Sequence, residues 1–250
     1  MREGATPAKV HLKREQVRPA PFPYAKRESE RVTSMKYKTI LFDLDGTLLY
    51  TVRDLADAVN HALEKHGFPT HTEERIARMV GNGVSLLVAR ALPLGYDTPG
   101  FEDVLADFRA YYSAHCEDNT HPYAGVVGLL RELKARSCHT AVVTNKYQTA
   151  AEDLVRRFFG DSVDVIVGDA PGRRCKPEPD APLAALEALG AGRDGAVYVG
   201  DTEVDRQTAE NTGLPFICVS WGYRSLAELQ AMEMPVIARD AGELLALLED

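Results

Sequence analysis

Short apolar segments recur along residues 36–250, and a segment with helical spacing follows most of them. The apolar segments are nearly continuous and rich in β-branched residues, as in parallel strands buried on both faces; they cover residues 39–42, 140–144, 163–168, 196–200 and 216–220. Helices are predicted at 125–136, 147–160, 180–190 and 204–213, and one more strand and a closing helix at 235–250. This alternation predicts an α/β fold with a doubly wound parallel sheet.

The segment between Leu49 and Tyr123 breaks this alternation. It shows no strand pattern, but apolar residues recur at helical spacing in four stretches, at 53–67, 73–80, 84–92 and 101–116. We therefore predict a small helical cap domain at residues 50–121, inserted after the first strand of an α/β core that comprises residues 36–49 and 122–250. Because ligands of open α/β sheets bind at the carboxyl edge, such an insert is positioned to act as a lid.

Residues 1–35 differ from the rest of the chain in composition. In residues 1–34, eight Lys and Arg residues stand against four Glu residues, prolines are frequent and apolar periodicity is absent. We interpret the segment as a disordered basic tail, or as sequence upstream of a true start at Met35. An organelle-targeting or docking arm is the alternative, which the glutamates and prolines disfavour.

Composition limits the classes of partner. The 250 residues carry a formal net charge of -8, which disfavours a nucleic-acid backbone or an anionic membrane surface. No apolar run approaches the roughly 18 residues of a membrane span. Four cysteines without paired spacing are typical of a reducing compartment, so we expect a cytoplasmic protein. We expect the protein to be a monomer or a homodimer.

Two aspartates, Asp43 and Asp45, follow the first predicted strand and precede Gly46. Residues two apart in extended backbone point the same way, so both carboxylates face the region beyond the strand end. Paired carboxylates repel each other and lose solvation unless a metal ion or a reacting phosphate compensates, and Mg²⁺ suits such a pair. A calcium loop is excluded, because Gly46 takes the fourth position rather than the sixth, and Asp54 rather than glutamate takes the twelfth.

The ends of later predicted strands also carry polar residues. Thr144 and Asn145 precede a helix, where a hydroxyl and backbone N–H groups either bind an anion or simply cap the helix. Lys176 lies in a loop stiffened by the following proline, although a single lysine is more often a solvated surface group. Asp201 ends another strand, and Asp205 falls in the first turn of the next helix, where a carboxylate also favours the helix N-terminus. Together, these features at successive strand ends indicate one shared site.

The motifs "DLDGT", "VVTN", "CKP" and "GDTEVD" resemble, in order and spacing, the four signature motifs of the haloacid dehalogenase superfamily. The resemblance covers residues 36–250, and the helical insert is similar to the small helical cap of that family. Within the superfamily, "MVGNGVSLLVARAL", "CKPEPDAPLAALEALG" and "WGYR" look most like bacterial phosphoglycolate phosphatases. The resemblance thus implies an enzyme that acts on a small phosphorylated metabolite.

This resemblance implies a role for each motif residue. Asp43 would attack phosphorus and form an aspartyl-phosphate, and Asp45 would act as general acid and then as general base. Mg²⁺ would be held by Asp43, the backbone carbonyl of Asp45 and Asp201, while Asp205 would orient the water ligands of the metal or Lys176. The transferring phosphoryl group would be bound by residues of the second and third motifs, namely Thr144, Asn145 and Lys176.

A few residues separate the branches of the superfamily. Asp45 favours a phosphatase over a dehalogenase, which has no leaving oxygen to protonate. Leu55 stands where the branch resembling β-phosphoglucomutase has a cap histidine, and Lys65, the only cap lysine, is placed poorly for the Schiff base of the phosphonate-hydrolysing branch. Hydrolysis of a phosphate ester is therefore implied. Tyr50 departs from the pattern, because the family usually has aspartate there, which leaves the polar contacts of the cap hinge open.

The cap loop "VGNGV", residues 80–84, resembles the substrate-specificity loop of phosphoglycolate phosphatases. Gly81, Asn82 and Gly83 would bring backbone N–H groups to a small carboxylate, or else form only a turn between two cap helices. Arg224 is expected at the rim of the site or on the surface. The expected substrate is 2-phosphoglycolate; inorganic pyrophosphate, another small phosphorylated metabolite and a catalytically silent binding module are the alternatives.

Overall fold

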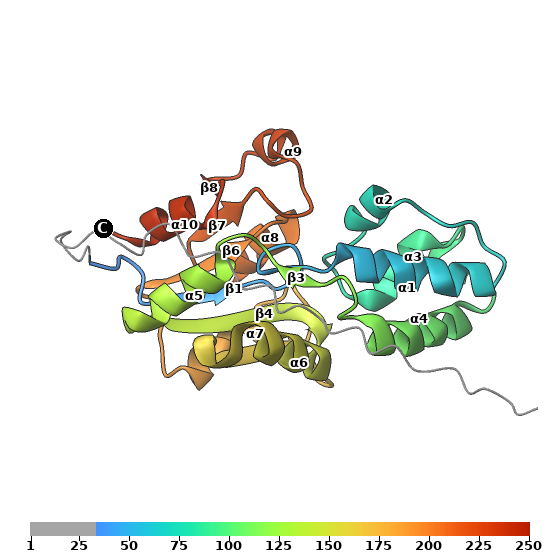
Figure 1. Cartoon of the computed structure of the whole chain (residues 1–250), viewed down its shortest axis with the longest axis horizontal. Coiled ribbons are helices and arrows are strands. Elements are labelled where there is room, and N and C mark those ends of the chain that lie inside the picture. Colours follow the sequence, from blue (N-terminus) through green and yellow to red (C-terminus); the bar gives the residue numbers. More distant parts are fainter. Residues whose placement is uncertain (1–33) are drawn as a thin grey trace, which may run out of the picture. The chain divides into compact units, whose positions relative to one another are not determined.

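In the computed structural model, which describes residues 34–250, six parallel strands form one sheet. The strands are β1 (Thr39–Phe42), β4 (His139–Tyr147), β5 (Val165–Asp169), β6 (Ala196–Gly200), β7 (Phe216–Val219) and β8 (Ile237–Ala238), in the order β5-β4-β1-β6-β7-β8 (Figure 1). β1 therefore lies between β4 and β6. This arrangement confirms the predicted doubly wound α/β fold, with each predicted strand near its expected bounds.

Helices cover both faces of this sheet. α5 (Val126–Ala135) contacts α6 (Gln148–Phe159) and α10 (Ala241–Leu248), while α7 (Asp180–Ala188) contacts α8 (Glu203–Thr212) on the other face. The alternation of side chains along β1 explains why two helical layers are needed. Leu41 packs with Ala185 of α7 and Ala209 of α8, whereas Ile40 and Phe42 point to the opposite face and are also fully buried.

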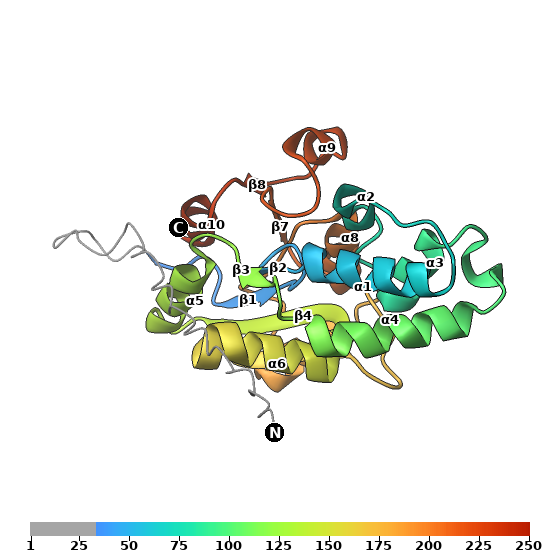
Figure 2. The same cartoon turned by 45° about the vertical axis from the view of Figure 1, so that its right-hand side comes forward.

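The helical insert that follows β1 consists of α1 (Val52–Lys65), α2 (Glu73–Ala77), α3 (Val84–Ala91) and α4 (Phe101–His115), with a short 3-10 helix, η1 (Gly95–Asp97) (Figure 2). In α1, apolar residues at helical spacing such as Leu55, Val59 and Ala62 are buried. They belong to a cluster of buried residues between Leu55 and Tyr112 that is separate from the cluster under the sheet. The insert thus has a hydrophobic core of its own, and its four predicted helices are confirmed.

The expectation that no strand lies between Leu49 and Tyr123 is wrong at its two ends. β2 (Leu49–Tyr50) and β3 (His121–Pro122) form a short antiparallel ladder where the chain enters and leaves the insert. Two residues are too few to show a hydrophobic period, and their pairing depends on segments distant in sequence. The short helix α9 (Leu226–Ala231), which starts from a capping box, and the 3-10 helix η2 (Gly160–Ser162) are not predicted either.

The predicted tail, residues 1–35, falls almost entirely outside the described residues. Of that segment only Ser34 and Met35 are described, and Met35 is buried and forms a β-bridge with Glu249. The backbone N–H of Lys36 also donates to the carbonyl of Leu248, at 3.0 Å. Met35 therefore packs with the folded part of the chain, while the tail stays a prediction for residues 1–33, which lie outside the described residues.

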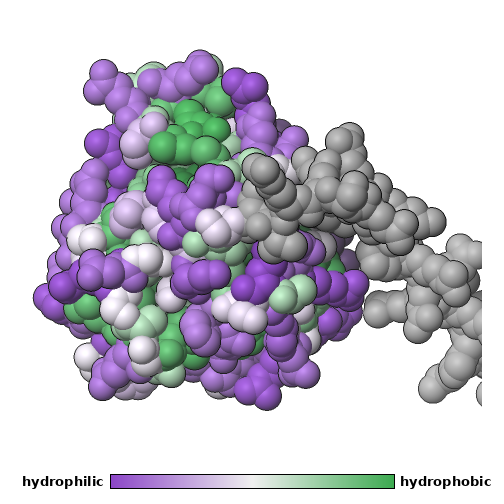
Figure 3. Space-filling model, turned by 90° about the vertical axis from the view of Figure 1, so that its left-hand side faces the viewer, coloured by the Kyte–Doolittle hydropathy of each residue, from purple (hydrophilic) through white to green (hydrophobic). Residues whose placement is uncertain are grey.

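A membrane and water make different demands on the helices and on the surface of residues 34–250. None of these helices has both the length and the apolar character that a membrane crossing requires. On the face seen in Figure 3, which lies on the side of α10, hydrophilic residues predominate and apolar groups lie between them. Such a mixture is ordinary for a protein surface in water.

Candidate active site

The carboxyl ends of β1, β4 and β6 meet at one edge of the sheet, which brings Asp43, Thr144 and Asp201 together. A cavity lies at this edge. Residues at the strand ends and in the following loops line one side of it, namely Asp43, Asp45, Thr144, Asn145, Lys146, Thr202 and Tyr223. The insert lines the other side with Leu55, Val80, Gly81, Gly83, Val84 and Leu87. Residues predicted from separate strand ends thus surround one space beneath the insert.

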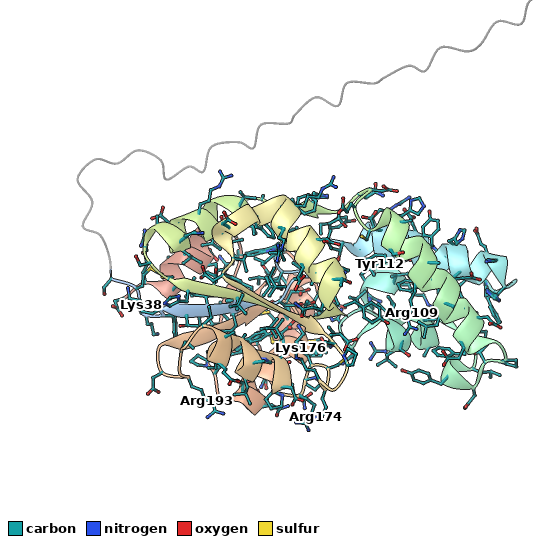
Figure 4. All side chains as sticks on the ribbon, turned by 90° about the horizontal axis from the view of Figure 1, so that it is seen from below. Lys38, Arg109, Tyr112, Arg174, Lys176 and Arg193 are labelled. Carbon is teal, nitrogen blue, oxygen red and sulfur yellow. The ribbon has the colours of Figure 1, made fainter. Side chains whose placement is uncertain are left out.

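Lys176 is a buried residue that joins two of the carboxylates, rather than a solvated surface group. Its Nζ lies 2.7 Å from Asp43 Oδ1, 2.7 Å from Asp205 Oδ1 and 3.3 Å from the hydroxyl of Tyr198. Figure 4 shows its side chain in the interior of the protein. Burial and the charge of Asp205 raise the pKa of Asp43 well above its usual value, although Lys176 acts in the opposite direction. A single ammonium group therefore does not balance the charge of this cluster.

Asp201 and Asp205 are fully buried, and hydrogen bonds hold both carboxylates. Asp201 accepts from Thr47 Oγ1 at 3.1 Å and from the backbone N–H of Tyr223 at 2.8 Å. Asp205 Oδ2 accepts from the N–H and the hydroxyl of Thr202, at 3.1 and 2.7 Å, in a capping box at the start of α8. Asp205 therefore caps this helix while its other oxygen contacts the lysine.

The carboxylates of Asp43, Asp201 and Asp205 each place one oxygen within 4.8 Å of the others. Burial, together with the charge of Asp205, raises the pKa of Asp201 to about 7. Within residues 34–250, Lys176 is the only cation that pairs with a carboxylate of this cluster. Excess negative charge and a donor set of carboxylate oxygens fit a divalent cation such as Mg²⁺.

The turn after the two aspartates requires a glycine. Gly46 has a φ of +92°, a region that favours glycine, and a Cβ atom on it would lie 2.4 Å from Asp201 Oδ2. The backbone thus approaches the Asp201 carboxylate more closely than a side chain would allow. This approach also brings Thr47, the next residue, within hydrogen-bond distance of the same carboxylate.

We expect Gly46→Ala to lower both stability and activity. Backbone strain at a positive φ costs about 1–3 kcal/mol, and the clash displaces the Asp201 carboxylate, so turnover of a phosphate ester should fall by about 100-fold. Gly190→Ala is the matched control, because Gly190 has a φ of +62° but no atom within 4 Å of the added Cβ. Thermal unfolding and steady-state kinetics of both variants check this. Equal activity in the two variants would contradict it.

The second aspartate, Asp45, is held by two side chains. Its Oδ1 accepts a hydrogen bond from Thr51 Oγ1 at 2.7 Å and lies 3.0 Å from Lys146 Nζ. Thr51 Oγ1 lies 2.6 Å from the hydroxyl of Tyr223, and Lys146 Nζ lies 2.7 Å from the hydroxyl of Tyr112 on α4 (Figure 4). Asp45 is therefore connected through Lys146 to a helix of the insert.

Lys146 and Tyr223 are site residues that sequence reasoning missed. Lys146 follows the predicted pair Thr144 and Asn145 in β4, whose register is irregular between Val143 and Tyr147, and all three residues line the cavity. Its place directly after the polar pair that ends the apolar run is the signal that was available. Tyr223 lies in an irregular loop after β7, where no periodic pattern places it.

Asn145 joins the loop of the insert to the loop that carries Lys176. Its Nδ2 donates to the carbonyl oxygens of Gly81 and Lys176, at 2.9 and 3.1 Å, and its Oδ1 accepts from the N–H of Lys176 at 2.7 Å. Gly81 and Gly83 line the cavity. Asn82 is not among the lining residues, and its side chain accepts from an arginine of α3 at 3.1 Å. The side chain of Asn145 thus positions two loops of the site.

Of the two placements expected for Arg224, at the rim of the site or on the surface, the surface placement is wrong. It is 6% exposed, pairs with Glu203 at 2.9 Å and donates to the carbonyl of Ala77 in the insert at 3.2 Å. It does not line the cavity, so it connects the insert to the sheet domain. At the hinge, the off-pattern Tyr50 makes a polar contact of its own, because its hydroxyl donates to Glu73.

Leu55 and Lys65 are the two insert residues on which the mutase and phosphonate-hydrolysing branches were disfavoured. Leu55 lines the cavity with an apolar side chain. Lys65 pairs with Asp107 at 2.7 Å, and its side chain is 57% exposed. The cavity therefore has leucine where the mutase-like branch has a histidine, and Lys65 does not line it as a Schiff-base lysine would.

A sequence model of the haloacid dehalogenase-like hydrolases matches residues 40–219. The chain belongs to this family. The match extends from β1 to β7 and contains all four strand-end motifs. The predicted family is therefore confirmed.

Two curated relatives of this haloacid dehalogenase-like hydrolase are phosphatases by name. It is 37% identical over 195 residues to phosphoglycolate phosphatase of Rhodospirillum rubrum, covering 74% of this chain and 80% of that protein. It is 32% identical over 190 residues to N-acetylmuramic acid 6-phosphate phosphatase of Pseudomonas aeruginosa, covering 76% and 84%. A solved structure, a candidate phosphoglycolate phosphatase from Lactobacillus delbrueckii subsp. bulgaricus, has a TM-score of 0.82 and 35% identity, covering 86% of this chain and 99% of that one. The chain is accordingly a phosphoglycolate phosphatase-like hydrolase of this family.

Proposed function

We propose that the protein hydrolyses a small phosphate monoester in a Mg²⁺-dependent reaction, through an aspartyl-phosphate on Asp43, and that 2-phosphoglycolate is its substrate. The observation that carries the proposal is the buried cluster of Asp43, Asp201 and Lys176 beside a cavity that Asp45 also lines. Such an excess of buried negative charge is costly unless a cation binds to it, and a bound divalent cation in turn attracts a phosphate. This cost disfavours a catalytically silent module.

Asp43 is the proposed nucleophile. Lys176 Nζ binds one of its oxygens at 2.7 Å, and residues 34–250 offer the other oxygen no hydrogen-bond donor. That second oxygen is free to attack phosphorus from the strand end. Protein oxygens take all three N–H donors of Lys176, so it acts through its charge and offsets part of the repulsion between the carboxylate and the phosphate. The Thr144 hydroxyl, which lines the cavity, binds a transferring phosphoryl oxygen. Asn145 supports Lys176 by holding the loop that carries it.

Asp45 is the proposed general acid and base. It lines the same cavity as Asp43, so one carboxylate attacks while the other donates a proton to the leaving alkoxide. The deprotonated Asp45 then takes a proton from the water that cleaves the aspartyl-phosphate, which restores its protonated form and frees Asp43. Thr51 and Lys146 fix its carboxylate during both steps.

Mg²⁺, when bound, neutralises charge on the phosphate and the nucleophile. Its proposed ligands are Asp43, Asp201 and the backbone carbonyl of Asp45. Asp205 belongs to the same cluster, but the ammonium group of Lys176 lies 2.7 Å from its Oδ1, whereas Asp201 pairs with no cation among residues 34–250. We therefore assign Asp205 to the positioning of Lys176.

The lining of the insert supports a small substrate. Four apolar side chains of the insert line the cavity, and the loop of Gly81 and Gly83 offers backbone N–H groups to a small carboxylate. We propose that the insert, residues 50–121, closes over the substrate as a cap. The names of the relatives favour 2-phosphoglycolate and supply N-acetylmuramic acid 6-phosphate as the second candidate.

Steady-state phosphate release with and without Mg²⁺ tests the proposal. The panel contains 2-phosphoglycolate, N-acetylmuramic acid 6-phosphate, inorganic pyrophosphate and other small phosphorylated metabolites. We expect release that a chelator abolishes, with the highest kcat/KM for 2-phosphoglycolate. A higher kcat/KM for another compound would replace the substrate and keep the mechanism. No release from any compound, p-nitrophenyl phosphate included, would favour the silent module.

A further inference from the structure

Lys146 is the only cationic side chain among residues 34–250 that lines the cavity. It extends from the carboxyl end of β4 and is 5% exposed. Its Nζ has two protein partners there, Asp45 Oδ1 at 3.0 Å and the hydroxyl of Tyr112 at 2.7 Å. An ammonium group has three N–H donors, so one donor remains for a ligand in the cavity.

The other cations near the site are already engaged. Lys176 Nζ contacts three protein oxygens and is not among the lining residues. Arg224 pairs with Glu203 and with a carbonyl of the insert, also away from the lining. A negative group on the organic part of a substrate therefore finds its cation at Lys146.

Lys146 Nζ also lies close to the position of the leaving oxygen. Under the proposed function, the Asp45 carboxylate that Nζ contacts at 3.0 Å donates a proton to that oxygen. Either carboxylate oxygen can carry that proton, so at ordinary hydrogen-bond lengths Nζ is within roughly 8 Å of the leaving oxygen. A carboxylate on the carbon that bears this oxygen, as in 2-phosphoglycolate, falls within that distance. The carboxylate of N-acetylmuramic acid 6-phosphate belongs to a lactyl ether on another ring carbon, several bonds farther away.

We propose that Lys146 determines specificity by binding a carboxylate adjacent to the scissile ester, so that the enzyme selects phosphate esters of small α-hydroxy acids. The inference rests on the proposed phosphatase function and deepens it. Lys146 is buried in a cavity that apolar side chains of the insert also line, and in such surroundings its pairing with a carboxylate is stronger than in water. The contact with Tyr112 fixes the ammonium group against α4 and orients its remaining donor.

The test compares 2-phosphoglycolate with 2-hydroxyethyl phosphate, in which a neutral hydroxymethyl group replaces the carboxylate. A charge-assisted hydrogen bond changes affinity by about 10- to 100-fold, so the wild type should prefer 2-phosphoglycolate by this factor in kcat/KM. In Lys146→Met the preference should disappear, and in Lys146→Arg, which keeps the charge, much of it should remain. Because Lys146 also contacts Asp45, Lys146→Met should lower kcat/KM for both substrates. The ratio of the two kcat/KM values then reports the contribution of the substrate carboxylate alone.

Two outcomes would overturn the inference. One is a ratio that Lys146→Met leaves unchanged while both substrates slow alike, which would make Lys146 a positioning residue for Asp45. The other outcome comes from calorimetric titration of Asp43→Asn with each ester in the presence of Mg²⁺. This measurement needs neither turnover nor a stable Lys146 variant. A Kd for 2-phosphoglycolate that is no tighter than the Kd for 2-hydroxyethyl phosphate would contradict the inference. Failure of the proposed function looks different, because the wild type would then release phosphate from neither ester.

Discussion

Asp43→Asn is expected to abolish turnover of 2-phosphoglycolate, lowering kcat by about 10⁴-fold or more. The amide is isosteric with the carboxylate and keeps an oxygen for Lys176, which lies 2.7 Å from Asp43 Oδ1. It lacks the anionic oxygen that attacks phosphorus, so no aspartyl-phosphate forms. Phosphate release at saturating Mg²⁺ measures the loss, and acid-quenched enzyme should contain no acyl-phosphate.

The stability of the same variant separates lost chemistry from lost structure. Burial and the charge of Asp205 raise the pKa of Asp43, so removing this charge relieves repulsion in the cluster. Without Mg²⁺, Asp43→Asn should therefore have a Tm at or above that of the wild type. The exposed Asp97, outside the site, gives a matched control, since Asp97→Asn should change neither kcat nor Tm. Residual turnover near the wild-type rate in Asp43→Asn would refute the nucleophile assignment.

The elements that the sequence predicted well share one physical origin. A parallel strand buried on both faces has to be apolar along its length, so the first polar residue after it marks the strand end. Asp43 and Asp201 are such residues, whereas Thr144 follows the apolar run but lies inside β4, and the sheet order places the three strands side by side. No local sequence pattern specifies the order of the strands in the sheet. The family resemblance nevertheless implied that the motif residues form one site, and this site results from the strand order.

The features that the sequence did not predict depend on contacts between distant segments. Asp54 is one example, because its buried carboxylate accepts from the hydroxyl of Thr120 at 2.7 Å, where the chain leaves the insert. The contact of Lys146 with Tyr112 is another, since it joins a strand end to a helix of the insert. A hydrophobic period describes how one element faces a core, and it carries no information on which polar side chains meet across two cores.

Asp45→Asn is expected to separate the two halves of the reaction. With 2-phosphoglycolate, whose alkoxide needs a proton to leave, kcat should fall by about 10²- to 10⁴-fold. With p-nitrophenyl phosphate, whose phenolate leaves without a proton, the first half should still proceed. One equivalent of p-nitrophenol per enzyme should then appear in a burst, followed by slow turnover, because asparagine accepts no proton from the hydrolytic water. Stopped-flow absorbance resolves the burst from the slow phase.

Two variants place this result in context. Asp43→Asn should show no burst with p-nitrophenyl phosphate, because the nucleophile itself is missing. Thr51→Val removes a hydroxyl that binds Asp45 at 2.7 Å but keeps the carboxylate, so both substrates should slow modestly and together. If Asp45→Asn gave no burst, Asp45 would be needed for the attack by Asp43 and not only for proton transfer. A burst of full amplitude assigns the two carboxylates, two residues apart on one strand end, to successive covalent and proton-transfer steps.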